Sequence, residues 1–219
     1  MFDFDGLICE TESADLLSWQ EVFQAHDVEL PLAWWHELVG TAGGPRPDDL
    51  LFEMIGEYDR EAVRLVRRER YLGLVDVAPL CDGVLAWLEG ARELGLLVGL
   101  ATSAPRSWLD RHLPRLGIDA HFDCICTIDD VVRAKPAPDL YQAVLKALGV
   151  EPSEAVAVED SPNGILAARR AGLRTVAVPN SVTVGLAFDQ PDLVIPSLLQ
   201  SSLADVVARL ASAGEVCLG

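Results

Sequence analysis

From residue 84 onward the sequence alternates short apolar runs with amphipathic stretches, and this alternation constrains the fold more than any other feature. Apolar runs without polar alternation are typical of parallel strands that are covered on both faces. Amphipathic stretches between them predict helices that connect one strand to the next by right-handed crossovers. The sequence therefore predicts an α/β fold built on a parallel sheet. The predicted strands are 97–101, 122–128, 155–158, 175–178 and 193–195, and the predicted helices are 84–94, 107–116, 138–148 and 164–171.

Glycines mark the ends of these helices. Gly95, Gly117, Gly149 and Gly172 each lie just past a helical pattern. Helices commonly end on a residue in the left-handed conformation, which glycine adopts without steric cost. We therefore expect a positive φ at these four positions.

Residues 12–75 follow a different pattern, because no convincing strand occurs there. The helical stretches in this part of the chain are 12–26, 32–38, 48–55 and 60–74. We expect a small helical domain, residues 12–78, inserted into a core domain formed by residues 1–11 and 79–219. The first strand of that core can hold only residues 1–4, which is short beside the roughly five residues of an average strand. Either the strand is short in this protein or it begins upstream of Met1.

Charge restricts the possible partners. The chain has 17 basic and 34 acidic residues, a formal net charge of −17, while half of its residues are hydrophobic. The apolar content indicates a folded core and not an acidic disordered chain. Nucleic acids and anionic membranes are bound by basic surfaces, so we expect neither as a partner. No run of about 18 apolar residues occurs, and we expect no membrane span.

The cysteines indicate a reducing compartment. They are five in number and irregularly spaced, and the Cys124-x-Cys126 pair fits neither a redox motif nor a zinc site. We interpret them as small core residues in the reduced state. The N-terminus lacks the basic and apolar regions of a signal peptide. We expect a cytoplasmic protein, and a monomer.

Two carboxylates stand at the end of the predicted first strand, in Asp3-Phe4-Asp5-Gly6. Side chains alternate faces along a strand, so Asp3 and Asp5 start on the same side. The carboxyl ends of strands are where open α/β sheets bind ligands. Two adjacent carboxylates repel each other unless a cation or a shared proton relieves them, and a magnesium ion held by oxygens does so. The alternative is an acidic turn that caps a helix.

Three further stretches carry polar residues beside predicted strand ends. Thr102 and Ser103 follow one strand, Glu159 and Asp160 close another, and Lys135 precedes a helix in Ala-Lys-Pro-Ala-Pro. Taken alone, the first two stretches would be read as helix caps and Lys135 as a solvated side chain. Taken with the aspartates they form an ordered set: Asp-x-Asp-Gly, a strand ending in Thr, Lys-Pro, and a strand ending in Glu-Asp-Ser.

This set resembles the haloacid dehalogenase superfamily of aspartate-nucleophile phosphohydrolases. It looks closest to the branch that contains beta-phosphoglucomutase and small sugar-phosphate phosphatases. The resemblance covers nearly the whole chain and includes a helical cap inserted directly after the first motif. It implies a three-layer Rossmann-like parallel sheet core with an inserted small α-helical cap domain.

The resemblance also implies catalytic roles. Asp3 would attack phosphorus and form an aspartyl-phosphate, and Asp5 would protonate the leaving alcohol and then activate water. Thr102 would bind phosphoryl oxygens, and Lys135 would balance charge between the nucleophile and the transferring group.

A magnesium site and a substrate site are implied in the same way. The family resemblance assigns Mg²⁺ to Asp3, the backbone carbonyl of Asp5, Asp160 and, by expectation, Glu159. The Ser103 amide would bind phosphoryl oxygens, and Arg46 would reach the part of the substrate that is not transferred. The predicted substrate-binding residues are Gly6, Trp19, Thr41, Arg46, Ser103 and Ala104.

The chain departs from the family pattern in the cap. Glu10 stands where the family often has aspartate, and we interpret it as a hinge and cap-facing residue. Beta-phosphoglucomutase has a cap histidine that assists the proton-transferring aspartate, but the matching residue here is Asp15. Arg67 and Arg70 belong to a basic cluster for which we expect a solvated helix face, with Glu61 or Glu69 as partners.

The predicted function is hydrolysis of a small phosphorylated metabolite. Phosphomutase is the alternative, since the same residues serve both reactions, and the missing cap histidine weakens it. A dehalogenase would lack the second aspartate, which is present here as Asp5. A non-catalytic phosphate-binding relative is the alternative from another class, and we would expect it to have lost Asp3 or Lys135.

Overall fold

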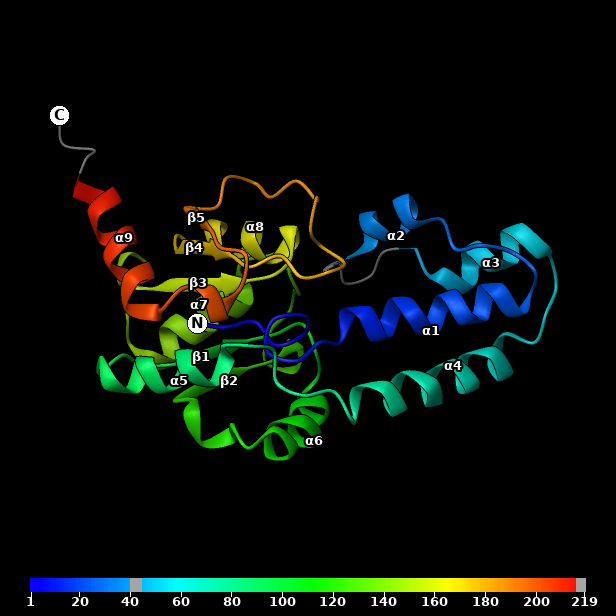
Figure 1. The fold of residues 1–219 in the computed structure, drawn as a ribbon, viewed down its shortest axis with the longest axis horizontal. Coiled ribbons are helices and arrows are strands. Elements are labelled where there is room, and N and C mark those ends of the chain that lie inside the picture. The colour runs from blue at the N-terminus through cyan, green and yellow to red at the C-terminus, as the bar shows by residue number, and fades with distance from the viewer. Residues whose placement is uncertain (40–44, 216–219) are drawn as a thin grey trace.

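A computed structural model describes residues 1–39 and 45–215 of the chain (Figure 1). Its strands are β1 (Gly99–Ala101), β2 (Cys124–Cys126), β3 (Val156–Glu159), β4 (Arg174–Ala177) and β5 (Leu193–Val194). β1 pairs with β2, β3 with β4, and β4 with β5, and every pairing is parallel. The predicted parallel α/β fold is confirmed.

The N-terminal segment joins the two halves of this sheet. Phe2 forms parallel bridges with Leu100 of β1 and with Val158 of β3. The order across the sheet is therefore β2, β1, the N-terminal segment, β3, β4, β5. The extended segment is brief because the chain turns at once, with the Ile8 N–H donating to the Phe4 carbonyl at 2.9 Å. The predicted first strand is thus a central but minimal strand.

The helices of this part of the chain lie close to their predicted positions. They are α5 (Val84–Glu93), α6 (Arg106–Leu116), α7 (Asp139–Leu148) and α8 (Pro162–Arg170), and a further helix, α9 (Leu203–Glu215), follows them. Positive φ angles occur at Gly95, Gly117, Gly149 and Gly172, as expected. The sequence analysis missed α9, which packs Val206 and Leu210 into the core. Short 3-10 turns, also not predicted, are Asp119–His121, Ile128–Asp130, Pro152–Glu154 and Leu198–Gln200.

Side-chain alternation along the strands divides the core into two clusters, one on each face of the sheet. Leu100 and Val158 face a cluster that includes residues of α5, α6 and α9. Their neighbours Ala101 and Ala157 face a second cluster that includes residues of α7 and α8. Helices thus cover both faces, which gives the three layers that an apolar parallel sheet requires.

Four further helices form a separate layer beyond the carboxyl edge of the sheet (Figure 1). They are α1 (Glu12–Ala25), α2 (Leu32–Leu38), α3 (Pro47–Ile55) and α4 (Arg60–Val75). Their core contains Trp19, Phe23, Trp35 and Leu51. The chain enters and leaves this layer side by side, because Cys9 and Leu80 form an antiparallel bridge. We refer to α1–α4 as the helical layer.

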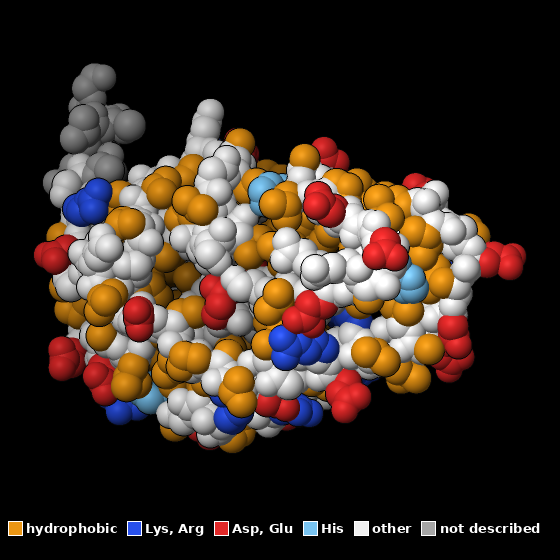
Figure 2. All heavy atoms as spheres, turned by 45° about the vertical axis from the view of Figure 1, so that its right-hand side comes forward, with side chains coloured by type: hydrophobic (Ala, Val, Ile, Leu, Met, Phe, Trp, Pro, Cys, Tyr) orange, Lys and Arg blue, Asp and Glu red, His pale blue; other side chains and the backbone are white. Residues whose placement is uncertain are grey.

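On the face that Figure 2 shows, the acidic residues do not gather into one patch. Figure 2 shows red side chains spread over the visible face, with some arginines beside them. Across the described residues, no helix combines the length and the apolar character that a membrane crossing needs.

Candidate active site

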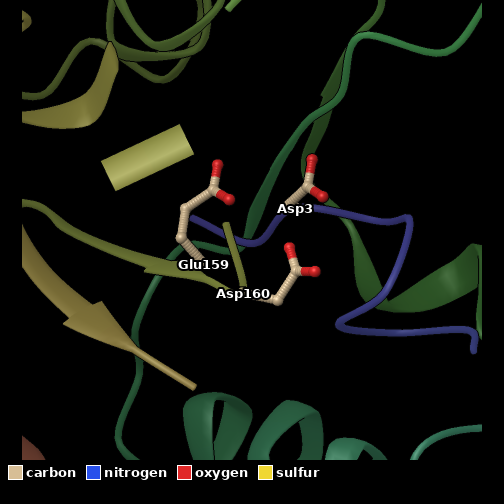
Figure 3. Close-up of side chains that lie close together, drawn as sticks. All are labelled: Asp3, Glu159 and Asp160. Atoms are coloured by element: carbon tan, nitrogen blue, oxygen red, sulfur yellow. The ribbon is translucent and has the colours of Figure 1, made fainter. Parts of the chain in front are cut away.

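The sequence motifs converge at the carboxyl edge of the sheet. Asp3 lies at the end of the N-terminal segment, and beside it Glu159 ends β3 and Asp160 follows directly. The three carboxylates belong to adjacent parallel segments, and Figure 3 shows them around one space. All three residues are buried, with exposed fractions of 7%, 0% and 1%. Parallel strands bring their carboxyl ends to one edge, so this convergence follows from the topology.

Lys135 is the cation of this site. Its Nζ donates to Asp3 Oδ1 at 2.5 Å and to Glu159 Oε1 at 2.6 Å. The residue is 4% exposed, so the alternative of a solvated lysine is wrong. Burial by itself would lower the pKa of Lys135, but the carboxylates of Asp3 and Glu159 raise it above its usual range. The side chain is therefore a permanent positive charge between two carboxylates.

The donor set fits a divalent cation. One carboxylate oxygen from each of Asp3, Glu159 and Asp160 lies within 4.8 Å of the others. Glu159 Oε2 is buried and accepts no hydrogen bond within the described part of the chain. A buried carboxylate oxygen without a partner is costly, and a metal ion would relieve that cost. An all-oxygen set of this kind suits hard divalent cations.

The raised pKa values of the carboxyl groups in the site also favour a bound cation. Burial, opposed by Lys135 and reinforced by Asp3, raises the pKa of Glu159 to about 7. Burial and then the negative charge of Asp3 raise the pKa of Asp160 well above its usual value. Three carboxylates and one lysine leave an excess of negative charge. A bound cation would hold all three carboxylates in the charged form.

Tyr141 is a site residue that the sequence analysis missed. It lies on α7, is fully buried, and its hydroxyl donates to Glu159 Oε1. Lys135 donates to the same oxygen, so both protein donors bind Oε1, and Oε2 has no hydrogen-bond donor within the described part of the chain. The only sequence signal was a tyrosine at a core position of a predicted helix, which does not distinguish it from packing.

Replacing Tyr141 with phenylalanine should weaken binding of a divalent cation. The ring remains, but Oε1 loses one of its two donors and the carboxylate of Glu159 becomes freer to rotate. Removing such a supporting contact typically costs about tenfold in metal affinity. Calorimetric titration of Mg²⁺ into the purified protein measures it. Tyr58→Phe, which removes a hydroxyl bonded to the Asp48 carbonyl in the helical layer, is the matched control. Equal Mg²⁺ affinity in all three proteins would contradict the orienting role.

Asp5 lies beside this cluster with a different partner. Its Oδ1 accepts a hydrogen bond of 3.0 Å from Trp108 Nε1 of α6. Burial first, and then the charge of Asp3, raises the pKa of Asp5 to about 6. A carboxyl group with that pKa exchanges a proton near neutral pH, as a general acid and base must.

The strand-end residues are not helix caps. The N-cap of α6 is Pro105, and the N-cap of α8 is Ser161, whose hydroxyl accepts from the Gly164 N–H. Thr102 is 1% exposed, and its Oγ1 accepts from the Ala104 N–H at 3.0 Å. The helix-cap interpretation of Thr102 and of Glu159–Asp160 is therefore wrong.

Gly6, Gly164 and Asn180 shape the base of the site. A Cβ on Gly6, which has φ +78°, would lie 2.2 Å from Asp160 Oδ2. A Cβ on Gly164 would lie 1.9 Å from Glu159 Oε2. Asn180 donates to Asp160 Oδ2 at 2.7 Å and to the Gly6 carbonyl at 3.1 Å. Gly164 and Asn180 were not predicted as site residues, because their roles depend on what packs against them.

A cavity of about 550 Å³ lies between the carboxyl edge of the sheet and the helical layer. The sheet side supplies Asp3, Asp5, Lys135 and Asp160 among its lining residues. Gly6 is not among them, since it lies buried beneath Asp160. Thr41, predicted to bind substrate, lies outside the described residues. The other predicted substrate-binding residues, Trp19, Arg46, Ser103 and Ala104, all line the cavity.

The arginines of α4 do not pair as predicted. Arg67 contacts Asp15 and donates from Nε to Ser18 Oγ at 2.9 Å, and Arg70 forms a two-pronged pair with Glu21 at 2.8 Å. Glu61 and Glu69 are not the partners, because α1 packs alongside α4 and offers closer acceptors. The pairs hold α1 against α4.

Other residues of the helical layer have partners of their own. Arg46 is largely exposed and pairs with Asp48 at 3.3 Å. Glu10 Oε1 accepts from the Ser13 N–H at 3.0 Å, which places Glu10 at the start of α1. Asp15, which the sequence analysis matched to the mutase histidine by resemblance, lines the cavity.

Comparison with known proteins places these observations in a family. The sequence model of the haloacid dehalogenase-like hydrolase family matches residues 1–178. YhcW of Bacillus subtilis (strain 168) is 42% identical over 213 residues, 97% of each chain. Validoxylamine A 7'-phosphate phosphatase of Streptomyces hygroscopicus subsp. limoneus is 32% identical over 178 residues, 81% of this chain and 84% of that protein. CbbY from Rhodobacter sphaeroides, solved in complex with phosphate, is 29% identical with a TM-score of 0.74, covering 94% of this chain and 97% of that one.

Proposed function

The chain belongs to the haloacid dehalogenase-like hydrolase family as a phosphoric monoester hydrolase, and we propose that it releases phosphate from a small phosphorylated metabolite through an aspartyl-phosphate on Asp3. The observation that carries this proposal is the pairing of Asp3 with Lys135 in a buried acidic cluster, at the end of a cavity that is lined on its other side by the helical layer. We also propose that residues 12–78 form the cap domain of this hydrolase.

In the first step, a carboxylate oxygen of Asp3 forms a bond to phosphorus as the bond from phosphorus to the substrate alcohol breaks. Protonated Asp5 gives its proton to the departing oxygen, so the alcohol leaves neutral. In the second step, Asp5 takes a proton from water as the water oxygen attacks phosphorus and the bond to Asp3 breaks. Asp3 and Asp5 are thereby restored.

Charge stabilisation comes from residues around the phosphoryl group. Lys135 contacts the nucleophile directly and offsets its charge, and both residues are buried. Thr102 and the backbone at Ser103 line the cavity and would donate to phosphoryl oxygens. Asp3, Glu159, Asp160 and the Asp5 carbonyl would hold Mg²⁺. When bound, Mg²⁺ would supply positive charge toward the phosphoryl oxygens.

The cavity lining from the helical layer suits a hydroxyl-rich substrate. Asp15 and Glu12 are carboxylates that accept from hydroxyl groups, and Trp19 presents an aromatic ring. Burial first, and then Asp5 and Asp3, raise the pKa of Glu12 to about 8, so near neutral pH it also donates. These groups favour a sugar or polyol phosphate. Phosphomutase stays the alternative, and Asp15 at the position of the mutase histidine gives it no support.

A panel of phosphate esters tests the proposal. With Mg²⁺ present, the protein should release inorganic phosphate from p-nitrophenyl phosphate and, more efficiently, from at least one sugar or polyol phosphate. Release should stop when EDTA removes the metal and resume when Mg²⁺ is restored. Absence of turnover across sugar phosphates, phosphoglycolate, nucleotides and aryl phosphates would refute the phosphatase assignment. Turnover that requires a bisphosphate activator would favour the mutase.

A further inference from the structure

Asp5 does not project freely into the cavity, because an indole N–H fixes one of its oxygens. Trp108 Nε1 donates to Asp5 Oδ1 at 3.0 Å. Indole nitrogen is a donor only, so it bonds a carboxylate oxygen and never competes for the proton that Asp5 carries. The Thr11 side chain also interacts with this carboxyl group, so Trp108 fixes one oxygen of Asp5 and is not its sole partner.

Two further aromatic rings contact Trp108. The Tyr71 ring of α4 stacks on it, with centroids 5.7 Å apart and an interplanar angle of 9°. His112, one turn further along α6, packs edge-on with centroids 4.1 Å apart. Both contacts restrict rotation of the indole and so direct its N–H. Tyr71 belongs to the helical layer, whereas Trp108 and His112 belong to the sheet side.

The stack continues into the helical layer. The Arg67 guanidinium lies over the Tyr71 ring at 4.8 Å and over the Trp19 ring at 5.0 Å. Arg67 also pairs with Asp15 of α1. A continuous set of contacts therefore runs from α1 and α4 through Tyr71 and Trp108 to the carboxylate of Asp5.

We propose that Trp108 is a positioning residue for Asp5, and that Tyr71, by stacking on Trp108, makes this positioning depend on how the helical layer sits on the sheet. The inference rests on the proposed function, in which Asp5 transfers protons. When α4 moves away, Trp108 loses a face of its support and the Asp5 carboxylate loses its fixed orientation. Proton transfer to the leaving group is then efficient only while the layer is seated.

Leaving groups of different basicity test this directly. A good leaving group departs without a proton, whereas a poor one needs the general acid, which contributes about 10²–10⁴ in rate. Trp108→Phe keeps an aromatic ring against Tyr71 and removes the N–H. It should lower kcat/KM for benzyl phosphate about tenfold more than for p-nitrophenyl phosphate. Tyr71→Leu keeps the indole N–H but removes its stacking partner. It should also lower kcat/KM for benzyl phosphate relative to that for p-nitrophenyl phosphate.

Controls separate positioning from packing and from substrate contact. Trp34→Phe makes the same chemical change away from the cavity lining and should leave the ratio of the two kcat/KM values as in the wild type. Thermal unfolding of each variant reports structural damage, which would lower both kcat/KM values by the same factor. A lost substrate contact would likewise affect both esters equally.

The outcomes distinguish this inference from the function on which it rests. A selective loss with benzyl phosphate in both variants supports it. If the wild type hydrolyses both esters and Trp108→Phe shows the same ratio of the two kcat/KM values, the positioning role is overturned. The phosphatase assignment then stays intact. An altered ratio in Trp108→Phe but not in Tyr71→Leu overturns the dependence on the helical layer. Failure of the wild type to hydrolyse either ester overturns the proposed function and this inference with it.

Discussion

Replacing Asp3 with asparagine should reduce phosphate release to less than a few per cent of the wild-type rate and leave the fold nearly intact. The amide has the shape of the carboxylate but no nucleophilic oxygen anion, so the aspartyl-phosphate cannot form; losses for nucleophiles are typically about 10³-fold or more. Lys135 keeps Glu159 as a partner, and so does not become an unpaired buried cation. The measurement is phosphate release with Mg²⁺, alongside circular dichroism and thermal unfolding.

The matched control for that variant is Asp110→Asn. Asp110 is an exposed residue of α6, so the change removes one negative charge without touching the cavity. Its rate should stay close to that of the wild type. Mass spectrometry of acid-quenched wild-type protein should find a phosphoryl group on Asp3 during turnover, and none in Asp3→Asn. More than a few per cent of activity in Asp3→Asn would show that another group attacks phosphorus.

The sheet could be predicted from sequence because its strands are apolar on both faces. Runs such as 97–101 and 155–158 have no polar alternation, and only a sheet covered on both faces accommodates them. The helix α9 was missed although a predicted strand, 193–195, precedes it, because the mostly polar stretch 196–202, which includes Pro196, separates the two. The first strand was short in the sequence and is reduced in the structure to bridges of Phe2 with its two neighbouring strands, because the Asp5-Gly6 turn begins immediately after it.

The residues of the candidate site also divide into those that the sequence could predict and those that it could not. Residues at strand ends, such as Asp3 and Asp160, could be grouped from sequence, since parallel topology gathers strand ends at one edge. Trp108, Tyr141 and Asn180 could not, because each reaches the site by a side-chain contact from a helix or loop. Their residue types also serve ordinary packing or turn roles, so sequence alone gives no reason to select them. Trp108, Tyr141 and Asn180 contact the motif residues but do not themselves belong to a sequence motif.

Lys135→Met should abolish most turnover and also destabilise the metal-free protein, an effect that the other variants lack. The methionine fills a similar volume but leaves Asp3 and Glu159 without their shared cation in a buried site. Removing one partner of a buried ion pair typically costs about 3–5 kcal/mol of unfolding free energy. Lys146→Met is the matched control, because Lys146 is the other lysine of the chain and lies exposed on α7.

The pH dependence of the lost unfolding free energy in Lys135→Met identifies its cause. Glu159 already has a pKa of about 7 in the folded protein against 4.5 when unperturbed, and losing Lys135 must raise the folded value further. A carboxyl group with a raised folded pKa stabilises the fold while it is protonated, and that stability is lost as pH rises through the folded pKa. The deficit of Lys135→Met should therefore be small and nearly constant between pH 4.5 and 7, where Glu159 is protonated in both folded proteins, and it should grow above pH 7, as measured by urea unfolding in EDTA. Mg²⁺ should recover part of the stability, because it neutralises the same carboxylates, but not the turnover, because no cation then contacts Asp3 at the Lys135 position. A deficit independent of pH would attribute the destabilisation to packing and not to unpaired charge.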